Sequence, residues 1–327
     1  MTKKQVLVRV VTESLVANGL AAGDVLVAAV SGGVDSMTLL TVLAGLRSKL
    51  NVEVVAVHVN HGLRKTAGRD ERVVAEYAQK LTVPLVVEKV SLGKRKTSIE
   101  ERARELRYLA LRQVAANMGA KYILTAHTAD DQIETILFNF LRGAGVRGLA
   151  GMKELADGVL RPFLKVHKAE LSWYAKSNRV PHALDETNKS KAFTRNRIRL
   201  TLLPDLKKYN PQVEEQILRT GELMAGAERA LTQWAGEQLR WLSTRENGRV
   251  VIARSRFREL DPFAQTEVLK AAVLALGNDL SGLTQAHFDE ALKFVANLSG
   301  KPASKRIGGK LFVTRAYDKI TVSQTSL

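Results

Sequence analysis

The stretch Val25-Leu26-Val27-Ala28-Ala29-Val30-Ser31-Gly32-Gly33-Val34-Asp35-Ser36 decides the predicted fold. Its apolar first half is typical of a buried strand, and a helical pattern from Met37 to Leu43 follows at once. Two adjacent glycines let a ligand approach the backbone, and the free amides at the start of a helix attract anions such as phosphate. A lone Ser-Gly-Gly is also an ordinary tight turn capped by serine. The rest of the chain has to decide between these two interpretations.

Two common phosphate-binding motifs are absent from this stretch. It has no Lys-Ser or Lys-Thr pair after the last glycine, and it has no Gly-x-Gly-x-x-Gly pattern. It does contain Asp35, whose carboxylate is suited to holding Mg²⁺ on bound phosphates. If a nucleotide binds here, we expect Ser31, Gly32, Gly33, Val34, Asp35 and Ser36 to contact it.

The charge balance of the 327-residue chain is unusual. Lysine and arginine number 50 against 33 aspartate and glutamate residues, which gives a formal net charge of +17. This excess favours a polyanionic partner, and nucleic acid is favoured over a membrane because no basic amphipathic segment carries an apolar face. The length is enough for about two domains.

Cysteine is absent from the sequence, and so are the usual membrane signals. The lack of cysteine excludes disulfides, thiolate nucleophiles and thiolate metal sites together. The first residues lack the apolar core of a signal peptide, and no run approaches the roughly 20 apolar residues that span a bilayer. We therefore expect a cytoplasmic protein without a membrane partner.

Apolar runs alternate with helical segments over the first part of the chain. The predicted strands are Val25–Val30, Val52–Val59, Leu85–Val90 and Tyr122–Ala126, and the helical segments lie near 36–49, 69–82, 99–118 and 130–142. This alternation predicts an α/β fold with a doubly wound parallel sheet, in which ligands bind beyond the carboxyl ends of the strands. Polar residues gather at three such ends, in 31–36, 58–64 and 125–131.

The later part of the chain predicts a second, smaller and mainly helical domain. A basic helix is expected from Thr194 to Leu203, ending before Pro204, and a long helix is expected from Asn210-Pro211 to Leu242. We place the domain boundary there, with 1–211 as the catalytic domain and 212–327 as the second domain. The further predicted elements are the helices Pro262–Leu276 and Thr284–Leu298 and a hairpin of Lys310–Thr314 with Ile320–Val322.

The segment from His127 to Arg142 carries a group of carboxylates. Asp130 and Asp131 lie four and three residues before Glu134, which places these groups on one side of a helix start. Acidic residues in a first turn also stabilise a helix through its dipole, and this explains Asp130 well. Asp131 and Glu134 are then candidates to bind a cation, either a metal or an amine substrate, and to accept a proton.

Basic residues and histidines give weaker signals. Arg195 and Arg199 lie four apart on one predicted helix face, which suits contact with a phosphate backbone. His58 and His61 flank Asn60, but a third ligand at metal spacing is missing, so zinc is not expected. A Ser-His-Asp hydrolase is not favoured because Ser31 lacks the Gly-x-Ser-x-Gly motif, and a hydride-transfer enzyme is not favoured because its glycine pattern is absent.

The motifs taken together resemble the tRNA(Ile)-lysidine synthetase family of N-type ATP pyrophosphatases, within the PP-loop superfamily. The resemblance rests on the segments Ala29–Ser36, His58–Arg64, Glu101–Tyr108, Thr125–Thr135, Arg142–Leu149, Arg161–Leu164, Arg195–Arg199 and Asn210-Pro211. It covers about the first two thirds of the chain and implies an adenine nucleotide α-hydrolase-like sheet. Many family members carry an additional C-terminal domain, so we expect this chain to be either a shorter form or a clipped one.

The resemblance also implies a reaction and assigns residues to it. With ATP and Mg²⁺, the wobble cytidine of a tRNA(Ile) with a CAU anticodon would be adenylated at C2, and free L-lysine would then displace AMP. It implies ATP contacts from Ser31–Ser36 and His58, with Mg²⁺ near Asp35. Catalytic roles would fall to Asp131, Glu134, His127 and Arg104, lysine binding to Asp131 and Glu134, and tRNA binding to Arg64, Arg195, Arg197 and Arg199.

Two alternative functions remain open at this point. The absence of cysteine argues against relatives that transfer sulfur or use a cysteine to release ammonia from glutamine. A ligase of the same superfamily acting on a small molecule stays possible, as does an RNA-binding protein that uses ATP only as a ligand. The quaternary state is likewise open, with a homodimer as one possibility.

Overall fold

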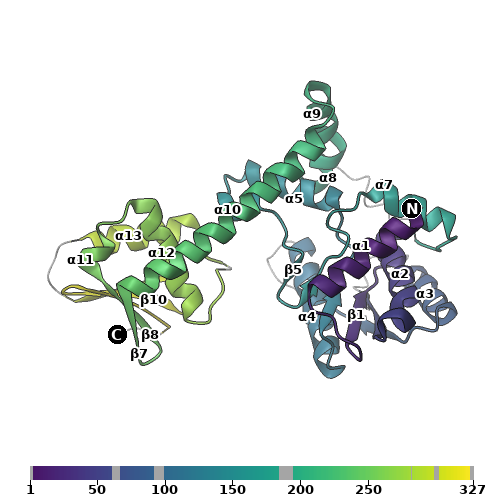
Figure 1. Cartoon of the computed structure of the whole chain (residues 1–327), viewed down its shortest axis with the longest axis horizontal. Helices are drawn as coiled ribbons and strands as arrows, with labels where there is room; N and C mark the ends of the chain where they lie inside the picture. The colour runs from purple at the N-terminus through teal and green to yellow at the C-terminus, as the bar shows by residue number, and fades with distance from the viewer. Residues whose placement is uncertain are drawn as a thin grey trace. The chain divides into compact units, whose positions relative to one another are not determined.

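The computed structural model describes residues 3–60, 67–91, 99–183, 194–280, 282–297 and 302–324. Its backbone divides into two compact units, Met1–Glu222 and Leu223–Leu327. Figure 1 shows the elements of each unit. The division lies inside helix α10 (Val213–Leu242), whereas the sequence places the boundary where Asn210-Pro211 opens that helix.

The N-terminal unit contains a six-stranded sheet in the order β3-β2-β1-β4-β6-β5. Its strands are β1 (Val25–Ala29), β2 (Glu53–Asn60), β3 (Leu85–Lys89), β4 (Tyr122–Leu124), β5 (Leu155–Ala156) and β6 (Val159–Leu160). All neighbouring strands run parallel except β5 and β6. The predicted doubly wound sheet is confirmed, and each of the four predicted strands is present. The sequence pattern did not predict β5 and β6, because two-residue strands leave no periodicity.

Helices cover both faces of this sheet. They are α1 (Lys3–Ala17), α2 (Val34–Leu50), α3 (Ala67–Lys80), α4 (Ile99–Asn117) and α7 (Lys168–Ser177). The unit also contains α5 (Ala129–Leu141) and α6 (Val146–Leu149), which pack against each other. Leu26 and Ala28 of β1 pack in a cluster with α1, α2 and α7, while Val27 packs in another cluster with α4. Because both faces are buried, the strands have nearly continuous apolar sequences. Among the described helices, none is long and apolar enough to cross a bilayer.

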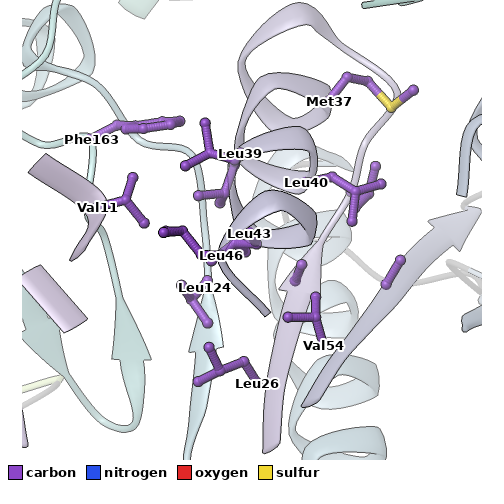
Figure 2. Packing of buried hydrophobic residues seen from close by; sticks show 14 of the residues in the cluster. Val11, Leu26, Met37, Leu39, Leu40, Leu43, Leu46, Val54, Leu124 and Phe163 are labelled. Carbon is purple, nitrogen blue, oxygen red and sulfur yellow. The ribbon is translucent and has the colours of Figure 1, made fainter. Parts of the chain in front are cut away.

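Helix α2 lies at the centre of the larger core. Figure 2 shows its buried leucines, including Leu39 and Leu43, close to Val11 of α1 and to Phe163. Leu39 and Phe163 are fully buried. This packing fixes the first turn of α2 at the carboxyl end of β1, where the Ser-Gly-Gly segment lies.

A third helical layer follows α7. It consists of α8 (Thr194–Arg197), a π-helical turn (Ile198–Leu202) and α9 (Leu203–Tyr209). The sequence analysis was wrong to end a helix before Pro204, because Pro204 lies in the first turn of α9. The missing amide of a proline costs no hydrogen bond in a first turn, and the π-helical turn closes through the bond from Leu203 N–H to the Ile198 carbonyl.

The C-terminal unit combines helices with an antiparallel sheet in the order β7-β8-β11-β10-β9. Its elements after α10 are β7 (Ser243–Glu246), β8 (Arg249–Ala253), α11 (Arg254–Phe257), α12 (Pro262–Ala275), α13 (Gln285–Ala296), β9 (Ala303–Gly308), β10 (Leu311–Ala316) and β11 (Lys319–Ser323). The predicted helices and the terminal hairpin β10–β11 are present. The sheet itself extends beyond the prediction, which missed β7, β8 and β9. Strand β7 is polar throughout and half of β9 is polar or charged, so neither has a strand-like apolar pattern, whereas β8 is apolar but short.

Candidate active site

The Ser-Gly-Gly segment forms a tight turn between β1 and α2. Gly32 has a φ of +88°, and the Ala183 amide donates to its carbonyl at 2.9 Å. The Ser36 hydroxyl accepts from the Ser31 amide at 3.1 Å and donates to the Gly33 carbonyl at 3.0 Å. No side chain caps Gly33 at the start of α2. The two serines therefore stabilise the turn, while the first amides of the helix remain able to bind an anion.

Asp35 follows this turn and is largely buried. Burial raises its pKa to about 6, the nearby Lys168 acts to lower that pKa, and Asp131 and Asp130 raise it. Its Oδ1 atom is buried without a hydrogen-bond partner. Among the described residues, no group of three or more His, Asp or Glu side chains could hold a metal alone. One unpartnered carboxylate fits Mg²⁺, which binds through one or two carboxylates together with substrate phosphates.

Asp131 lies at the start of α5 and has partners for both carboxylate oxygens. Its Oδ2 accepts from the Thr128 amide at 2.9 Å and from the Thr128 hydroxyl at 2.8 Å, which forms a capping box. Its Oδ1 accepts from Lys168 Nζ at 2.7 Å. Burial acts to raise the pKa of Asp131, but Lys168 and these hydrogen bonds hold that pKa below its usual value. Asp131 is therefore an ion-pair partner of this chain's own lysine.

Asp130 connects two helices. Its Oδ2 accepts from the Lys168 backbone amide at 2.8 Å and lies 3.4 Å from His167 Nδ1, so the carboxylate of α5 satisfies the first turn of α7. A carboxylate at a helix N-terminus is stabilised by the helix dipole. The sequence attributed Asp130 to such a role in its own helix, whereas the structure places its hydrogen bond in the neighbouring one.

Glu134 lines a cavity, together with Asp130 of the same helix. It is buried, and burial raises its pKa above the usual value. Its Oε1 has no hydrogen bond and lies 3.7 Å from Arg199 Nε. The adjoining cavity of about 150 Å³ is lined by apolar side chains and by the charged groups of Asp130, Glu134, Arg199, Lys207 and Glu214. An ammonium group is the natural partner for the unsatisfied Glu134 oxygen.

His127 lies at the end of β4 among arginines. Its Nδ1 is 2.8 Å from the Thr125 hydroxyl. Burial lowers the pKa of His127 to about 4, Asp131 opposes that change, and Arg161, Arg104 and Arg195 add to it. The ring is therefore neutral near pH 7, and the three arginines create a positive potential suited to a phosphate group.

The structure brings most of the predicted site residues to one edge of the sheet. Electrostatic effects on pKa connect Asp35, Asp131, Glu134, His127, Arg104, Arg195 and Arg199 in one group. His58 is buried, and its Nδ1 lies 2.8 Å from the Val30 carbonyl, so that ring nitrogen is engaged by the strand before the turn. Arg197 is exposed and donates to the Thr194 hydroxyl at 3.2 Å. Arg64 lies outside the described residues.

Two residues of this group were missed by the sequence analysis. Lys168 pairs with Asp131, and the buried Arg161 donates to the carbonyls of Lys153 and Val159 at 2.9 and 3.3 Å. Both follow β6, a strand of two residues that gave no pattern. The signal that could have found Arg161 is the segment Arg161-Pro162-Phe163-Leu164, which belonged to the resemblance but received no role.

The comparison with family models matches the segment that forms this site. The model of the PP-loop domain matches residues 5–206. Of the residues that line the cavity beside Glu134, all lie in that range except Lys207 at the end of α9 and Glu214 at the start of α10.

Curated relatives cover more of the chain. A tRNA(Ile)-lysidine synthase of Geobacter sulfurreducens is 34% identical over 312 residues, covering 92% of this chain and 65% of the relative. One of Dehalococcoides mccartyi is 34% identical over 303 residues, covering 88% and 63%. One of Thermotoga maritima is 38% identical over 204 residues, covering 60% and 49%. The chain thus spans less than two thirds of the length of these relatives.

A solved structure has a similar fold. The U34-tRNA thiolase NcsA from Methanococcus maripaludis matches with a TM-score of 0.58 and 17% identity, covering 68% of this chain and 79% of that one. At this identity the similarity concerns the fold alone.

The paired glycines of the turn should respond differently to alanine. Gly32→Ala should lower the free energy of unfolding by about 1–2 kcal/mol, because Gly32 has a positive φ that L-residues avoid. Gly33→Ala is the matched control: its φ is −74° and an added Cβ would lie 3.6 Å from Ser31 Oγ, so we expect a change within about 0.5 kcal/mol. Urea unfolding of both variants measures this, and equal losses would contradict the assigned backbone strain.

The raised pKa of Asp35 predicts a pH-dependent stability. Since the folded-state pKa is about 6 against 3.8 for the ordinary group, ionisation of Asp35 opposes folding, and stability is lost as pH rises between those values. Asp35→Asn should therefore stabilise the ligand-free chain by about 2 kcal/mol above pH 6 and by little near pH 4. Asp24→Asn is the control, because a hydrogen bond from Lys121 lowers the pKa of that carboxyl. Urea unfolding across this pH range is the measurement, and a pH-independent effect would contradict the prediction.

Proposed function

The chain belongs to the PP-loop family, and from that membership we propose that it ligates lysine to C2 of the wobble cytidine in a tRNA(Ile) anticodon, using ATP. One observation carries the proposal. A turn with open helix amides, a group of arginines around a neutral histidine and a cavity with an unsatisfied carboxylate lie together at the carboxyl edge of the sheet. The activity named for the curated relatives, that of a tRNA(Ile)-lysidine synthase, best unites these three features.

The first step joins the cytidine C2 oxygen to the α-phosphorus of ATP and releases pyrophosphate. The Ser31–Ser36 turn binds phosphate oxygens through the first amides of α2. Arg104, Arg161 and Arg195 surround the neutral His127 ring and stabilise the charge that develops on the α-phosphate. His127 then donates or accepts a hydrogen bond without adding charge, and Thr125 holds its Nδ1. Charge stabilisation and alignment are sufficient here, because a protein nucleophile is not required.

Mg²⁺ fits this site through Asp35. When bound, the ion neutralises the phosphates and stabilises the leaving pyrophosphate. The buried, unpartnered Asp35 Oδ1 would supply one ligand to the ion. The nearby Lys168 ammonium now pairs with Asp131. In the proposal it leaves that carboxylate and becomes a second cation on the same phosphates.

The second step joins the lysine nitrogen to C2 and releases AMP. The cavity beside Glu134 is the proposed lysine pocket, in which the unsatisfied Oε1 accepts from the substrate ammonium. The burial-raised pKa of Glu134 also suits it to take a proton from that ammonium before attack. Asp131 contributes to the same step mainly through Lys168, since both of its oxygens already have partners.

The RNA is proposed to cross the arginine-rich edge of this site. Arg195 faces the reaction centre, and Arg197 and Arg199 follow on the same helical layer. Arg64 and residues 212–327 are proposed to extend the contact with tRNA. The proposal also states that the amine substrate is free L-lysine and that the RNA carries a CAU anticodon. It further includes a homodimer and a cytoplasmic location.

An assay of nucleotide turnover tests the function directly. Incubation with ATP, Mg²⁺, radiolabelled lysine and unmodified tRNA(Ile) transcript should give AMP, pyrophosphate and labelled RNA. A tRNA of different anticodon is the control and should remain unlabelled. Pyrophosphate release that needs no tRNA would instead support a ligase of small molecules. RNA binding without turnover would support a binding protein.

The lysine pocket gives a specific kinetic prediction. Glu134→Gln should raise the KM for lysine roughly 10- to 100-fold, because a charge-assisted hydrogen bond is lost, while pyrophosphate release in the first step changes little. Asp131→Asn should impair lysine transfer more than adenylation, and it should also destabilise α5 by breaking the capping box.

Glu214→Gln is the matched control for the pocket. Glu214 lines the same cavity but already pairs with Lys207 at 2.8 Å, so its loss should leave the KM for lysine nearly unchanged. A Glu134→Gln enzyme with the wild-type KM for lysine would contradict the assignment of this cavity.

A further inference from the structure

The hairpin between β10 and β11 presents an unusual residue at its tip. Strand β10 ends at Ala316 and β11 begins at Lys319, so Tyr317 and Asp318 form the turn. Tyr317 has a φ of +52° and is 80% exposed. A left-handed backbone is uncommon for a bulky residue, and it costs free energy that the surrounding structure has to supply.

The same sheet contains a hairpin with the residues that such turns prefer. Between β7 and β8 the turn is Asn247-Gly248, with φ values of +50° and +72°. Asparagine and glycine tolerate this backbone with little strain. A tyrosine at position 317 therefore does not help to form the turn, and its exposed ring contributes little to the core of this unit.

The tip is held firmly in spite of its exposure. The Arg254 amide donates to the Asp318 carbonyl at 2.9 Å, and the Asp318 carboxylate accepts from the Ser255 amide and hydroxyl at 2.8 and 2.9 Å. Arg254 Nη1 also donates to the Tyr317 carbonyl at 3.3 Å. These bonds attach the turn to α11, so the ring is presented from a rigid base.

Exposed basic residues adjoin this attachment in the chain. Arg256 and Arg258, on and just after α11, are exposed, and so is Lys319 beside the tip. Within the described ranges, no ion pair involves any of the three, and Glu259 is an exposed acid nearby. An exposed aromatic ring among unpaired cations is the pattern by which proteins stack on unpaired bases and contact the adjoining phosphates.

We propose that Tyr317 is a base-stacking contact for the RNA substrate, with Arg256, Arg258 and Lys319 facing its phosphates. This inference rests on the proposed function, because it takes the RNA as the partner. It adds a defined RNA contact in the C-terminal unit. In this proposal the strained backbone of Tyr317 serves binding and not folding.

Opposite changes in stability and binding test the inference. In the full chain, Tyr317→Asn should raise the thermal midpoint by about 2 °C by relieving strain. It should weaken binding of a tRNA(Ile) transcript about 5- to 100-fold through lost stacking. Tyr317→Phe keeps the ring and should bind RNA within about twofold of the unaltered chain. Arg256→Ala should reduce the slope of log affinity against log salt by about 0.7–0.9.

The outcomes separate this inference from the proposed function. If the unaltered chain binds the tRNA and Tyr317→Asn binds it equally well, the stacking contact is overturned and the proposed function is unaffected. If the unaltered chain binds no tRNA and turns over ATP without it, the proposed function fails, and this inference fails with it. If Tyr317→Asn changes the oligomeric state in gel filtration while RNA affinity holds, the surface is a protein contact and the inference is overturned.

Discussion

The ion pair between Lys168 and Asp131 lies among several carboxyl groups at one edge of the sheet, and its ammonium group offsets the repulsion between their negative charges. Asp35, Asp130 and Glu134 all influence or respond to the same charges, and the 2.7 Å bond places the Lys168 ammonium among them. Removing one member of a partly buried pair leaves the other uncompensated, which is costly. The starts of α2, α5 and α7 therefore depend on one another. Asp130 strengthens this dependence by accepting a hydrogen bond from the first turn of α7.

Much of the N-terminal fold could be predicted from the sequence, because buried parallel strands leave continuous apolar runs. The same topology placed Asp35, His127 and the carboxylates of α5 together, since neighbouring parallel strands end at one edge. The short strands β5 and β6 could not be predicted, and Lys168 and Arg161, which follow β6, were missed for the same reason. In the C-terminal unit, the edge strands β7 and β9 lack the apolar periodicity on which the strand prediction rests, and the short apolar strand β8 was missed as well.

The division of labour among the carboxylates of α5 was also beyond the sequence. Spacings of three and four residues put Asp130, Asp131 and Glu134 on one side, but spacing alone does not distinguish a cap from a binding group. Hydrogen bonds make the distinction. Asp130 and Asp131 accept hydrogen bonds from α7 and within the capping box, whereas Glu134 Oε1 accepts no hydrogen bond and has only the longer ion-pair contact with Arg199. Partners from a distant segment thus decide which carboxylate is available to a substrate.

The π-helical turn at Ile198–Leu202 has a consequence for how this site could change in evolution. A π-helical turn behaves as an α-helix that has absorbed one extra residue. Arg199 lies within the turn, while Leu203, Pro204 and Lys207, which line the same cavity, lie after it. The alignment of these side chains around Glu134 is therefore controlled by chain length as well as by residue type. A single-residue deletion here would rotate one wall of the cavity against the other without altering any of its chemical groups.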